Sequence, residues 1–404
     1  AVGYAALSAN CGDNNTAVGA GALTSSTGSD NTFMGRSAGL VLSSGIKNTG
    51  VGAYALDAET SGSFSTAVGY AALGTQNVGG GAVVHNTAVG YSAGLAVTTG
   101  INNTLIGSLA GDALTDADYN VAVGYGALSS DTLGNRSIAI GRNALTTQNF
   151  TTATNSYNVA VGYDTGLNVT TGTHNTLVGP LSGFYATTAK YSTFVGYQAA
   201  KGSSGNGLTG NFNTSIGFES GFKLQTSGHE NTFLGAYAGY YNATDSTANG
   251  ITTGSNNAAI GFAAYPSSAT VDNEFTLGNA SVSNLRCNDT SISALSDERD
   301  KTNIVDVPLG LDFIKTLRPV AFDWNRRDGS NVGKKDFGFI AQELKTAQDA
   351  TDYADYMRLV HSGFVQVDNE DQESLEADPM KTYPVLIKAV QELSTALDAA
   401  LARI

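Results

Sequence analysis

The 404-residue chain has few cysteines, few charged side chains and no long hydrophobic run. Its two cysteines, Cys11 and Cys287, cannot form a disulfide framework, and no CxxC or His/Cys spacing typical of a zinc site occurs. No apolar stretch reaches the length that a membrane span requires, and the first residues lack the pattern of a signal peptide. These absences exclude a cysteine-rich secreted fold, a zinc domain and membrane insertion, and we expect no metal or other cofactor.

Charged residues make up 14 % of the chain, and the formal net charge is −14 at pH 7. Proteins that bind nucleic acid normally carry a basic surface, so no nucleic-acid partner is expected. The composition changes along the chain: 23 charged residues lie before position 296 and 33 lie after it, whereas 44 of the 49 glycines precede it. We therefore predict a repeat region at 1–280, a linker at 281–295 and a second domain at 296–404.

A short motif, NTAVGYAAL and its variants, recurs throughout the first region. Each copy has a glycine after an aliphatic residue, and we call these the marker glycines: Gly3, Gly19, Gly35, Gly52, Gly69, Gly90, Gly107, Gly124, Gly141, Gly162, Gly179, Gly196, Gly217, Gly235, Gly261 and Gly278. Most are 16–17 residues apart, and the segment 92–107 returns at 164–179, which indicates a duplication of four repeats. The chain begins inside a repeat, so we expect it to lack an N-terminal part of the protein.

This period predicts a parallel β-roll or β-solenoid of about sixteen coils. The density of Gly, Asn, Thr and Ser excludes helices. Sixteen or seventeen residues suit two short strands and two turns, and a strand spacing of ~4.8 Å gives a rod of roughly 70 Å. Because side chains alternate along a strand, Val18 and Ala17 must face opposite sides. We expect the residue before each marker glycine to fill the coil, and its predecessor to lie at contacts between chains.

Asn-Thr pairs open most repeats, at Asn15, Asn31, Asn48, Asn86, Asn103, Asn175, Asn213 and Asn231. Asparagine at a repeated turn predicts a ladder, in which the side chain bonds to backbone and tolerates a left-handed conformation. Glycan or calcium binding is the alternative, although few carboxylates flank these positions. His85 and His174, which precede two of these asparagines, are expected at the surface; in a threefold assembly each could instead meet its symmetry mates around a metal.

The second domain has a mixed α/β pattern. We predict helices at Leu309–Leu317 and Gln342–Gln348, strands at Val320–Trp324 and Phe337–Ile340, and a terminal helix at 384–404. Trp324 is expected in the core. The apolar positions of the terminal helix, at Leu386, Val390, Leu393, Leu397, Ala400 and Ile404, have heptad spacing. They predict a short helix bundle between chains, and packing of this helix on its own domain is the alternative.

Two known families share these patterns. The repeats resemble the head repeats of trimeric autotransporter adhesins, which are trimeric parallel β-rolls. The segment ALSDERDKTNI, at 294–304, followed by LDFIKTLRPVAFDW and FGFIAQEL, resembles the C-terminal intramolecular chaperone of phage tailspikes and tail fibres, the auto-processing serine peptidase family known from endosialidases. That resemblance implies a domain that trimerises the fibre, assists its folding and then cuts itself off.

The family motif maps onto this chain residue by residue. It implies Ser296 as the nucleophile, Lys301 as its partner, and a cut between Leu295 and Ser296. Asp297 and Arg299 complete the motif, and Gln342 and Glu343 match a second motif with a structural or inter-chain role.

A serine hydroxyl needs an adjacent base, and no His or Asp in a triad pattern is visible, so Lys301 is the candidate. It has to release its proton, which requires burial or nearby cations. The chain carries Asp300 where the family has an apolar residue, and this carboxylate would keep Lys301 charged and slow the cleavage. Without the resemblance, Ser296 and Asp297 would be interpreted as a helix N-cap or turn.

Together these features predict a homotrimeric phage tail fibre, part of the virion and assembled in the host cytoplasm. Its expected partners are a bacterial surface glycan or protein receptor and other tail proteins upstream. Peptidase activity is expected only in cis, with no external substrate. Receptor contacts are predicted in the extended turns Thr75–Val84, Thr147–Tyr157, Lys201–Asn211 and Tyr240–Thr253, where Phe150, Tyr157, Tyr240 and Tyr241 could stack on sugars.

Two alternatives remain at this stage. A capsule-depolymerising tailspike would need paired carboxylates in a groove. A cellular trimeric adhesin would need a membrane anchor at its C-terminus, where this chain has a short amphipathic helix.

Overall fold

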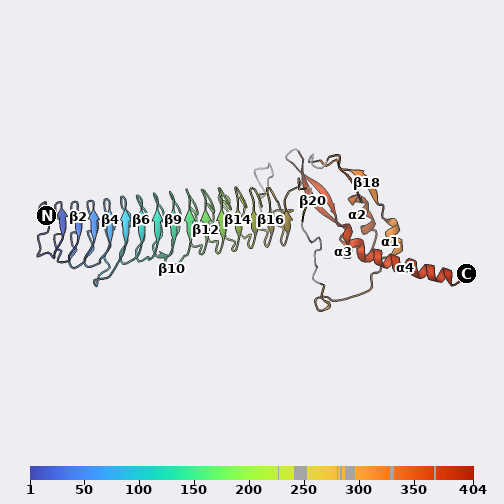
Figure 1. Ribbon diagram of the computed structural model, residues 1–404, viewed down its shortest axis with the longest axis horizontal. Helices are drawn as coiled ribbons and strands as arrows, with labels where there is room; N and C mark the ends of the chain where they lie inside the picture. The colour runs from blue at the N-terminus through green and yellow to red at the C-terminus, as the bar shows by residue number, and fades with distance from the viewer. Residues whose placement is uncertain are drawn as a thin grey trace. The chain divides into compact units, whose positions relative to one another are not determined.

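The computed structural model describes residues 1–225, 227–240, 253–279, 281–282, 284–286, 296–327, 332–367 and 370–404. Contacts within the chain define two compact units, one formed by Ala1–Asn242 and Thr247–Asn279 and the other containing Ala280–Ile404. The first unit appears in Figure 1 as a stack of parallel arrows, and the second as short helices and strands.

The first unit is a parallel β-solenoid whose strands form one fifteen-stranded sheet. The strands are β1 (Thr16–Val18), β2 (Thr32–Met34), β3 (Thr49–Val51), β4 (Thr66–Val68), β5 (Thr87–Val89), β6 (Thr104–Ile106), β7 (Val121–Val123), β9 (Ile138–Ile140), β11 (Val159–Val161), β12 (Thr176–Val178), β13 (Thr193–Val195), β14 (Thr214–Ile216), β15 (Thr232–Leu234), β16 (Ala258–Ile260) and β17 (Phe275–Leu277). The first coil contributes only a bridge from Val2 to Val18. The solenoid is therefore confirmed.

Each coil has one strand of three residues in this sheet, and turns occupy most of the remainder. The prediction of two strands per coil is wrong, because the turns follow one another too closely to leave a second extended segment. A second pairing occurs where a longer coil follows a coil of ordinary length: β8 (Gly134–Asn135) pairs with β10 (Thr154–Asn155), which lies in the longer coil. A bridge joins Ser63 to Val83. These residues lie 72 positions before Asn135 and Asn155, which also pair, and this agrees with the duplication seen in the sequence.

The marker glycines end the strands in a conformation that other residues avoid. Gly69, for example, has φ of +140°, and a Cβ added to it would lie 2.1 Å from the carbonyl oxygen of Gly90 in the next coil. Both the backbone angle and the close approach of successive coils therefore require glycine.

The interior of the coil is the reverse of our prediction. The second residue of each strand faces inward, and Ala17, Phe33 and Leu105 are completely buried. The third residue faces outward, and Met34 is 47 % exposed. Alternation correctly placed the two positions on opposite sides, but both are apolar, so it could not say which side is the interior. Small residues such as Ala predominate inside because neighbouring elements of a coil pack closely.

A ladder of buried asparagines runs along the solenoid and confirms the ladder prediction. The Oδ1 atom of Asn103 accepts the backbone N–H of Asn120 at 2.9 Å, and its Nδ2 donates to the carbonyl of Ala117 at 2.7 Å. Each asparagine thus joins successive coils. The left-handed residue is the one before each asparagine, such as Asn102 with φ of 60°, so the predicted turn is displaced by one position.

The second unit contains helices and, among its described residues, two antiparallel pairs of strands. Its elements are η1 (Glu298–Asp300), α1 (Leu311–Thr316), β18 (Val320–Asp323), β19 (Lys335–Gly338), α2 (Ala341–Asp349), α3 (Ala354–Met357), β20 (Val360–Val367), β21 (Glu370–Ala377), η2 (Pro379–Thr382) and α4 (Tyr383–Leu401). Strand β18 pairs antiparallel with β19, and β20 with β21. A small core of Phe313, Met357, Leu359 and Val385 lies between α1, α3, β20 and α4.

Most predicted elements of this unit occur within a few residues of their expected positions, but the β20–β21 hairpin and α3 were not predicted. Trp324 is not a core residue, because it is 37 % exposed. Its ring packs edge-to-face on Phe322 at 5.0 Å, and its Nε1 donates to Asp336 at 3.3 Å. Among the described residues, no helix has the length and apolar character needed to cross a bilayer.

Candidate functional sites

Ser296 and Lys301 lie together at the start of the described segment 296–327 of the second unit. The Nζ atom of Lys301 is 2.6 Å from the hydroxyl oxygen of Ser296 and 3.2 Å from its carbonyl oxygen. The 3₁₀ turn η1 makes this contact, since it brings the two ends of the segment back toward each other. Both side chains are exposed. The geometry allows a proton to pass between them, but the single chain does not bury the pair.

Asp297 and Arg299 support this turn. The carboxylate of Asp297 caps η1 by accepting the backbone N–H of Arg299 at 2.9 Å, and it pairs with the guanidinium at 3.0 and 2.7 Å. The hydrogen bond from the Arg299 side chain lowers the pKa of Asp297, and the same bond raises the pKa of Arg299. The N-cap role considered from the sequence is therefore filled by Asp297, and Ser296 is left to contact Lys301.

Two neighbouring residues bear on the predicted cleavage. Asp300 forms no ion pair with Lys301 among the described residues, although it directly precedes it. Leu295, which would supply the scissile carbonyl, lies outside the described residues. The described residues thus include the nucleophile and its candidate base. Of the predicted scissile bond between Leu295 and Ser296, they include only Ser296.

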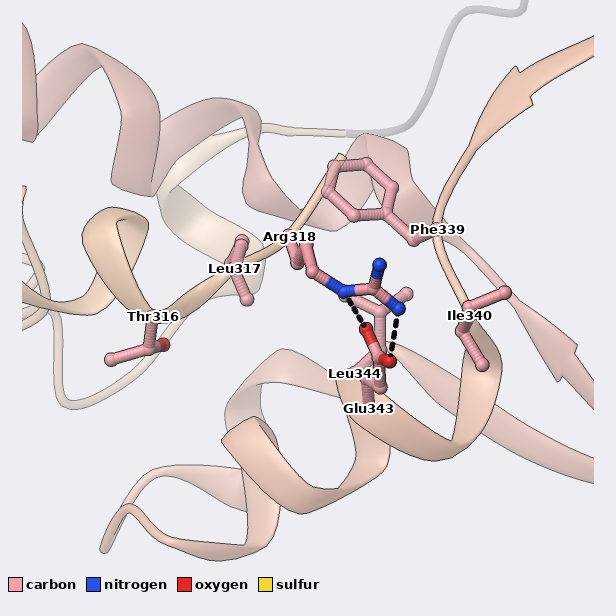
Figure 2. A pocket seen from close by; sticks show the side chains of 7 residues that line it. All are labelled: Thr316, Leu317, Arg318, Phe339, Ile340, Glu343 and Leu344. Carbon is pink, nitrogen blue, oxygen red and sulfur yellow. Dashed lines mark hydrogen bonds and ion pairs between the residues drawn. The ribbon is translucent and has the colours of Figure 1, made fainter. Parts of the chain in front are cut away.

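Glu343 has a structural contact in the second unit. As Figure 2 shows, its carboxylate faces the guanidinium of Arg318 beside Leu317, Phe339 and Ile340. Arg318 donates through Nε at 3.0 Å and also through Nη2. These bonds lower the pKa of Glu343 and raise that of Arg318. The hollow next to the pair has a volume of about 10 Å³, no more than one water molecule requires.

Gln342, the other residue of that motif, is exposed at the start of α2. Sequence reasoning missed three residues that hold this unit together. Arg318 pairs with Glu343, Gln348 accepts the backbone N–H of Leu359 at 2.6 Å, and Glu392 accepts that of Leu311 at 2.8 Å. Burial of a polar side chain such as Gln348 would have indicated a structural role, but burial cannot be read from the sequence.

The terminal helix α4 has two apolar faces, one buried and one exposed. Val385 and Ala389 are buried against the unit's own core. The predicted heptad positions face away from it: Leu386 is 44 % exposed, Leu393 55 % and Leu397 58 %. Both interpretations of this helix therefore apply, each to a different face.

The outward face of the fifteen-stranded sheet is also apolar. It combines a row of mainly threonines, at the first position of each strand, with an aliphatic row at the third position. We call the latter the aliphatic row: Val18, Met34, Val51, Val68, Val89, Ile106, Val123, Ile140, Val161, Val178, Val195, Ile216, Leu234, Ile260 and Leu277. All are half-buried or exposed, and none of these strands contains a charged residue. An apolar, uncharged face that continues over fifteen strands is typical of a surface that another protein covers.

The extended turns give a mixed result. Phe150 is only 6 % exposed and cannot stack on a sugar, because its turn folds it into the coil. Tyr157 is 47 % exposed, and Tyr240 contacts Phe222 and Tyr237. Tyr241 and the remainder of its turn to residue 252 lie outside the described residues.

His85 and His174 are exposed, as predicted, and each ring contacts an aromatic neighbour in the preceding coil. No group of three metal-ligating side chains occurs in the part of the chain that the structure describes.

Comparison with known proteins adds one finding. Residues 296–353 match the family model Peptidase_S74, described as the chaperone of endosialidase. No curated protein and no solved structure shows significant similarity to the chain. The match begins at the predicted nucleophile and includes Lys301, Arg318 and Glu343. A β-solenoid followed by a chaperone-of-endosialidase region fits a phage tail fibre with an intramolecular chaperone.

Proposed function

We propose that the protein is a homotrimeric fibre of a phage tail that attaches the virion to a bacterial surface. The observation that carries this proposal is the presence, in one chain, of a β-solenoid and of a segment that matches the chaperone of endosialidase. Proteins with such repeats need a device that fixes their alignment, because near-identical coils offer many wrong pairings between chains. The C-terminal region supplies that device.

Two apolar surfaces support self-association. The aliphatic row repeats at every coil, so the same row on a second and third chain can meet it along the whole length of the sheet. The exposed heptad positions of α4 offer a second, shorter contact of the same kind. Both surfaces would be exposed to water in a single chain, and both would be covered in a parallel trimer.

Cleavage is the second part of the proposal. The hydroxyl oxygen of Ser296 attacks the carbonyl carbon of Leu295, and Lys301 takes the hydroxyl proton and passes it to the departing amine of Ser296. The peptide C–N bond breaks and an ester forms. Water then hydrolyses the ester, which leaves a Leu295 carboxylate and restores the Ser296 hydroxyl. Because Ser296 and Lys301 are exposed in one chain, burial in the trimer would be what activates them.

Intact mass under denaturing conditions tests the cleavage. The full chain should yield a 109-residue fragment that begins at Ser296. The fragment should be absent from Ser296→Ala and Lys301→Ala, and present in Thr302→Ala, which removes a neighbouring exposed hydroxyl. It should form faster in Asp300→Leu. An uncut chain in the wild type and in Asp300→Leu would refute self-cleavage and leave the region as a permanent cap.

Light scattering of the purified protein tests the trimer. The wild type should have the mass of three chains. Ile106→Lys with Ile140→Lys, in the aliphatic row, should lose that mass, whereas Thr99→Lys with Thr152→Lys, at exposed turns, should keep it. A single-chain mass for the wild type would contradict the fibre.

A further inference from the structure

A row of mostly exposed side chains runs along the turns of the solenoid, with one member in each of most coils. Its members directly precede the buried Asn or Ser of the ladder, and each has a left-handed backbone. In the middle of the solenoid they form a continuous stack, which we call the ring ladder: Tyr119, Arg136, Tyr157, His174, Tyr191 and Phe212. Neighbours are between 4.8 and 5.9 Å apart, measured between ring centroids or from a centroid to the arginine Cζ.

Stacking between neighbours determines which ring faces of the ring ladder remain open to a ligand. The ring of Tyr157 lies between Arg136 and His174, and that of His174 lies between Tyr157 and Tyr191. An internal ring therefore has a neighbour on each side, which leaves little room for a ligand on either face. A sugar stacks on a ring face, so the internal members are poor partners for a sugar despite their exposure.

The ring ladder ends at Phe212. Tyr191 covers one face of its ring, at 5.1 Å and with the two planes within 6°. In the next coil Glu230 occupies the corresponding left-handed position, so the stack has no further ring there. Phe212 has no second ring partner in the described part of the chain, and it is 55 % exposed. Because one face of its ring stacks on Tyr191 of the preceding coil, its second face is on the side of the following coil, which contains Glu230.

A hollow of about 300 Å³ lies at this break, lined by Thr209, Gly210, Asn211, Phe212, Ser227, His229 and Glu230. Its volume is at the lower end of the range for sites that bind small ligands.

The walls of this hollow are fixed by the solenoid itself. The backbone N–H of Phe212 donates to Lys190 at 3.0 Å, that of Glu230 to Asn211 at 3.0 Å, and that of His229 to the Ser255 hydroxyl at 3.3 Å. The positions of the ring and of the polar side chains are thus set before any ligand arrives.

The polar groups of the hollow complement the ring. The carboxylate of Glu230 lies 3.5 Å from Nδ1 of His229, and the Glu230 side chain is 54 % exposed. The Oδ1 atom of Asn211 accepts the backbone N–H of Lys190, which orients the amide and leaves Nδ2 as a donor. One aromatic face, one carboxylate and one amide donor are therefore held around a single small space.

We propose that this hollow binds one neutral hexopyranose unit of a bacterial surface glycan. A pyranose has an apolar face of C–H groups that can pack on the open face of Phe212, and its hydroxyls can donate to Glu230 and accept from Asn211. The carboxylate and the net charge of −14 oppose a sialic or uronic acid. This inference rests on the proposed adhesion function, for which it names the ligand class and the site.

Saturation-transfer NMR on the full chain tests this site, with the methyl glycosides of glucose, galactose and mannose as probes. At least one should give a signal, and that signal should fall about tenfold or more in Phe212→Ala, since truncation of an aromatic anchor removes most of the contact. Glu230→Gln should lower it less. The matched control is Phe64→Ala: Phe64 has the same left-handed backbone, but Lys47 and His85 lie against its ring.

Several outcomes would overturn the proposal. They are the absence of a signal from every neutral glycoside, an equal signal in Phe212→Ala, an equal loss in Phe64→Ala, and a stronger signal from the methyl glycosides of glucuronic or sialic acid. Light scattering of the same samples distinguishes failure of the sugar site from failure of the proposed fibre. A three-chain mass without glycoside binding refutes the site alone, and a single-chain mass refutes the fibre.

Discussion

The two units of the chain bury their apolar residues in opposite ways. In the solenoid nearly every coil contributes completely buried residues, such as Ala17, Phe33 and Leu105, to one continuous core. In the second unit only a few large side chains are buried, while Phe337 is 86 % exposed and the heptad positions of α4 face outward. A solenoid coil is therefore stabilised by the coils on either side of it. The second unit has a core too small for its apolar content, and the trimer that we propose would cover the rest.

Gly69→Ala should have the largest effect and should be confined to the solenoid. The new Cβ would clash with the Gly90 carbonyl at 2.1 Å, and φ of +140° is unfavourable for alanine. We expect a loss of more than about 5 kcal/mol, enough to unfold the neighbouring coils. Thermal unfolding followed by circular dichroism measures it.

Gly79→Ala is the control for this variant. Gly79 also has positive φ, but a Cβ there would meet nothing within 4 Å, so the cost should stay near 1 kcal/mol. Equal losses in the two variants would show that backbone angle alone, and not the close approach of coils, makes the marker glycines necessary.

Leu393→Lys should break the second unit's assembly and leave the solenoid's own fold intact. If Leu393 lies in a bundle between chains, the substitution buries an unpaired charge at a cost of about 3–5 kcal/mol. The variant should lose the three-chain mass in light scattering or show a lower unfolding midpoint. Gln391→Lys adds the same charge to another exposed position of α4 and should change neither. No difference between the two would mean that the heptad face remains in water.

Asn103→Ala should weaken the solenoid by about 2–3 kcal/mol. The change removes the bonds to Asn120 and Ala117 and leaves a buried N–H and a buried carbonyl without partners. Chemical denaturation gives the free energy of unfolding. Thr99→Ala, which removes one exposed bond to Asp116, should cost less than about 0.5 kcal/mol. A similar small loss in Asn103→Ala would mean that water enters the coil and replaces the side chain.

The contrast between the units also explains what the sequence could predict. The solenoid was predictable because the period and the glycine at the end of each strand recur in every repeat. Which of the two strand positions faces the core was not predictable, since Ala17 and Val18 are both apolar. The choice depends on the width of the coil, which the sequence does not show.

In the second unit, Ser296 and Lys301 are five residues apart, and a family pattern sufficed to pair them. Arg318 and Glu343 are 25 residues apart, with no pattern that links them. The β20–β21 hairpin was missed because Glu370–Ala377 is rich in acidic residues, which are uncommon in strands.

The smallest predicted effects are those of pH, and they have opposite signs in the two units. Partial burial raises the pKa of Asp112 in the solenoid above its ordinary value of 3.8, and one of its oxygens has no hydrogen-bond partner among the described residues. In the second unit, hydrogen bonding to Arg318 lowers the pKa of Glu343 below 4.5. Ionisation therefore opposes folding at Asp112 and favours it at Glu343.

Asp112→Asn should accordingly stabilise the protein at pH 7 by less than about 1 kcal/mol, because the carboxylate is screened by solvent. The gain should disappear below pH 3.8, where the wild-type carboxyl is protonated in both states. Glu343→Gln should destabilise it at pH 7, and that loss should disappear as the pH falls from 4.5 through the lowered pKa of the folded state. Unfolding midpoints of the two variants and the wild type between pH 3 and pH 7 would show the two differences converging on zero from opposite sides. A destabilising Asp112→Asn would mean that hydrogen bonding to the ionised Asp112 carboxylate outweighs the cost of its burial.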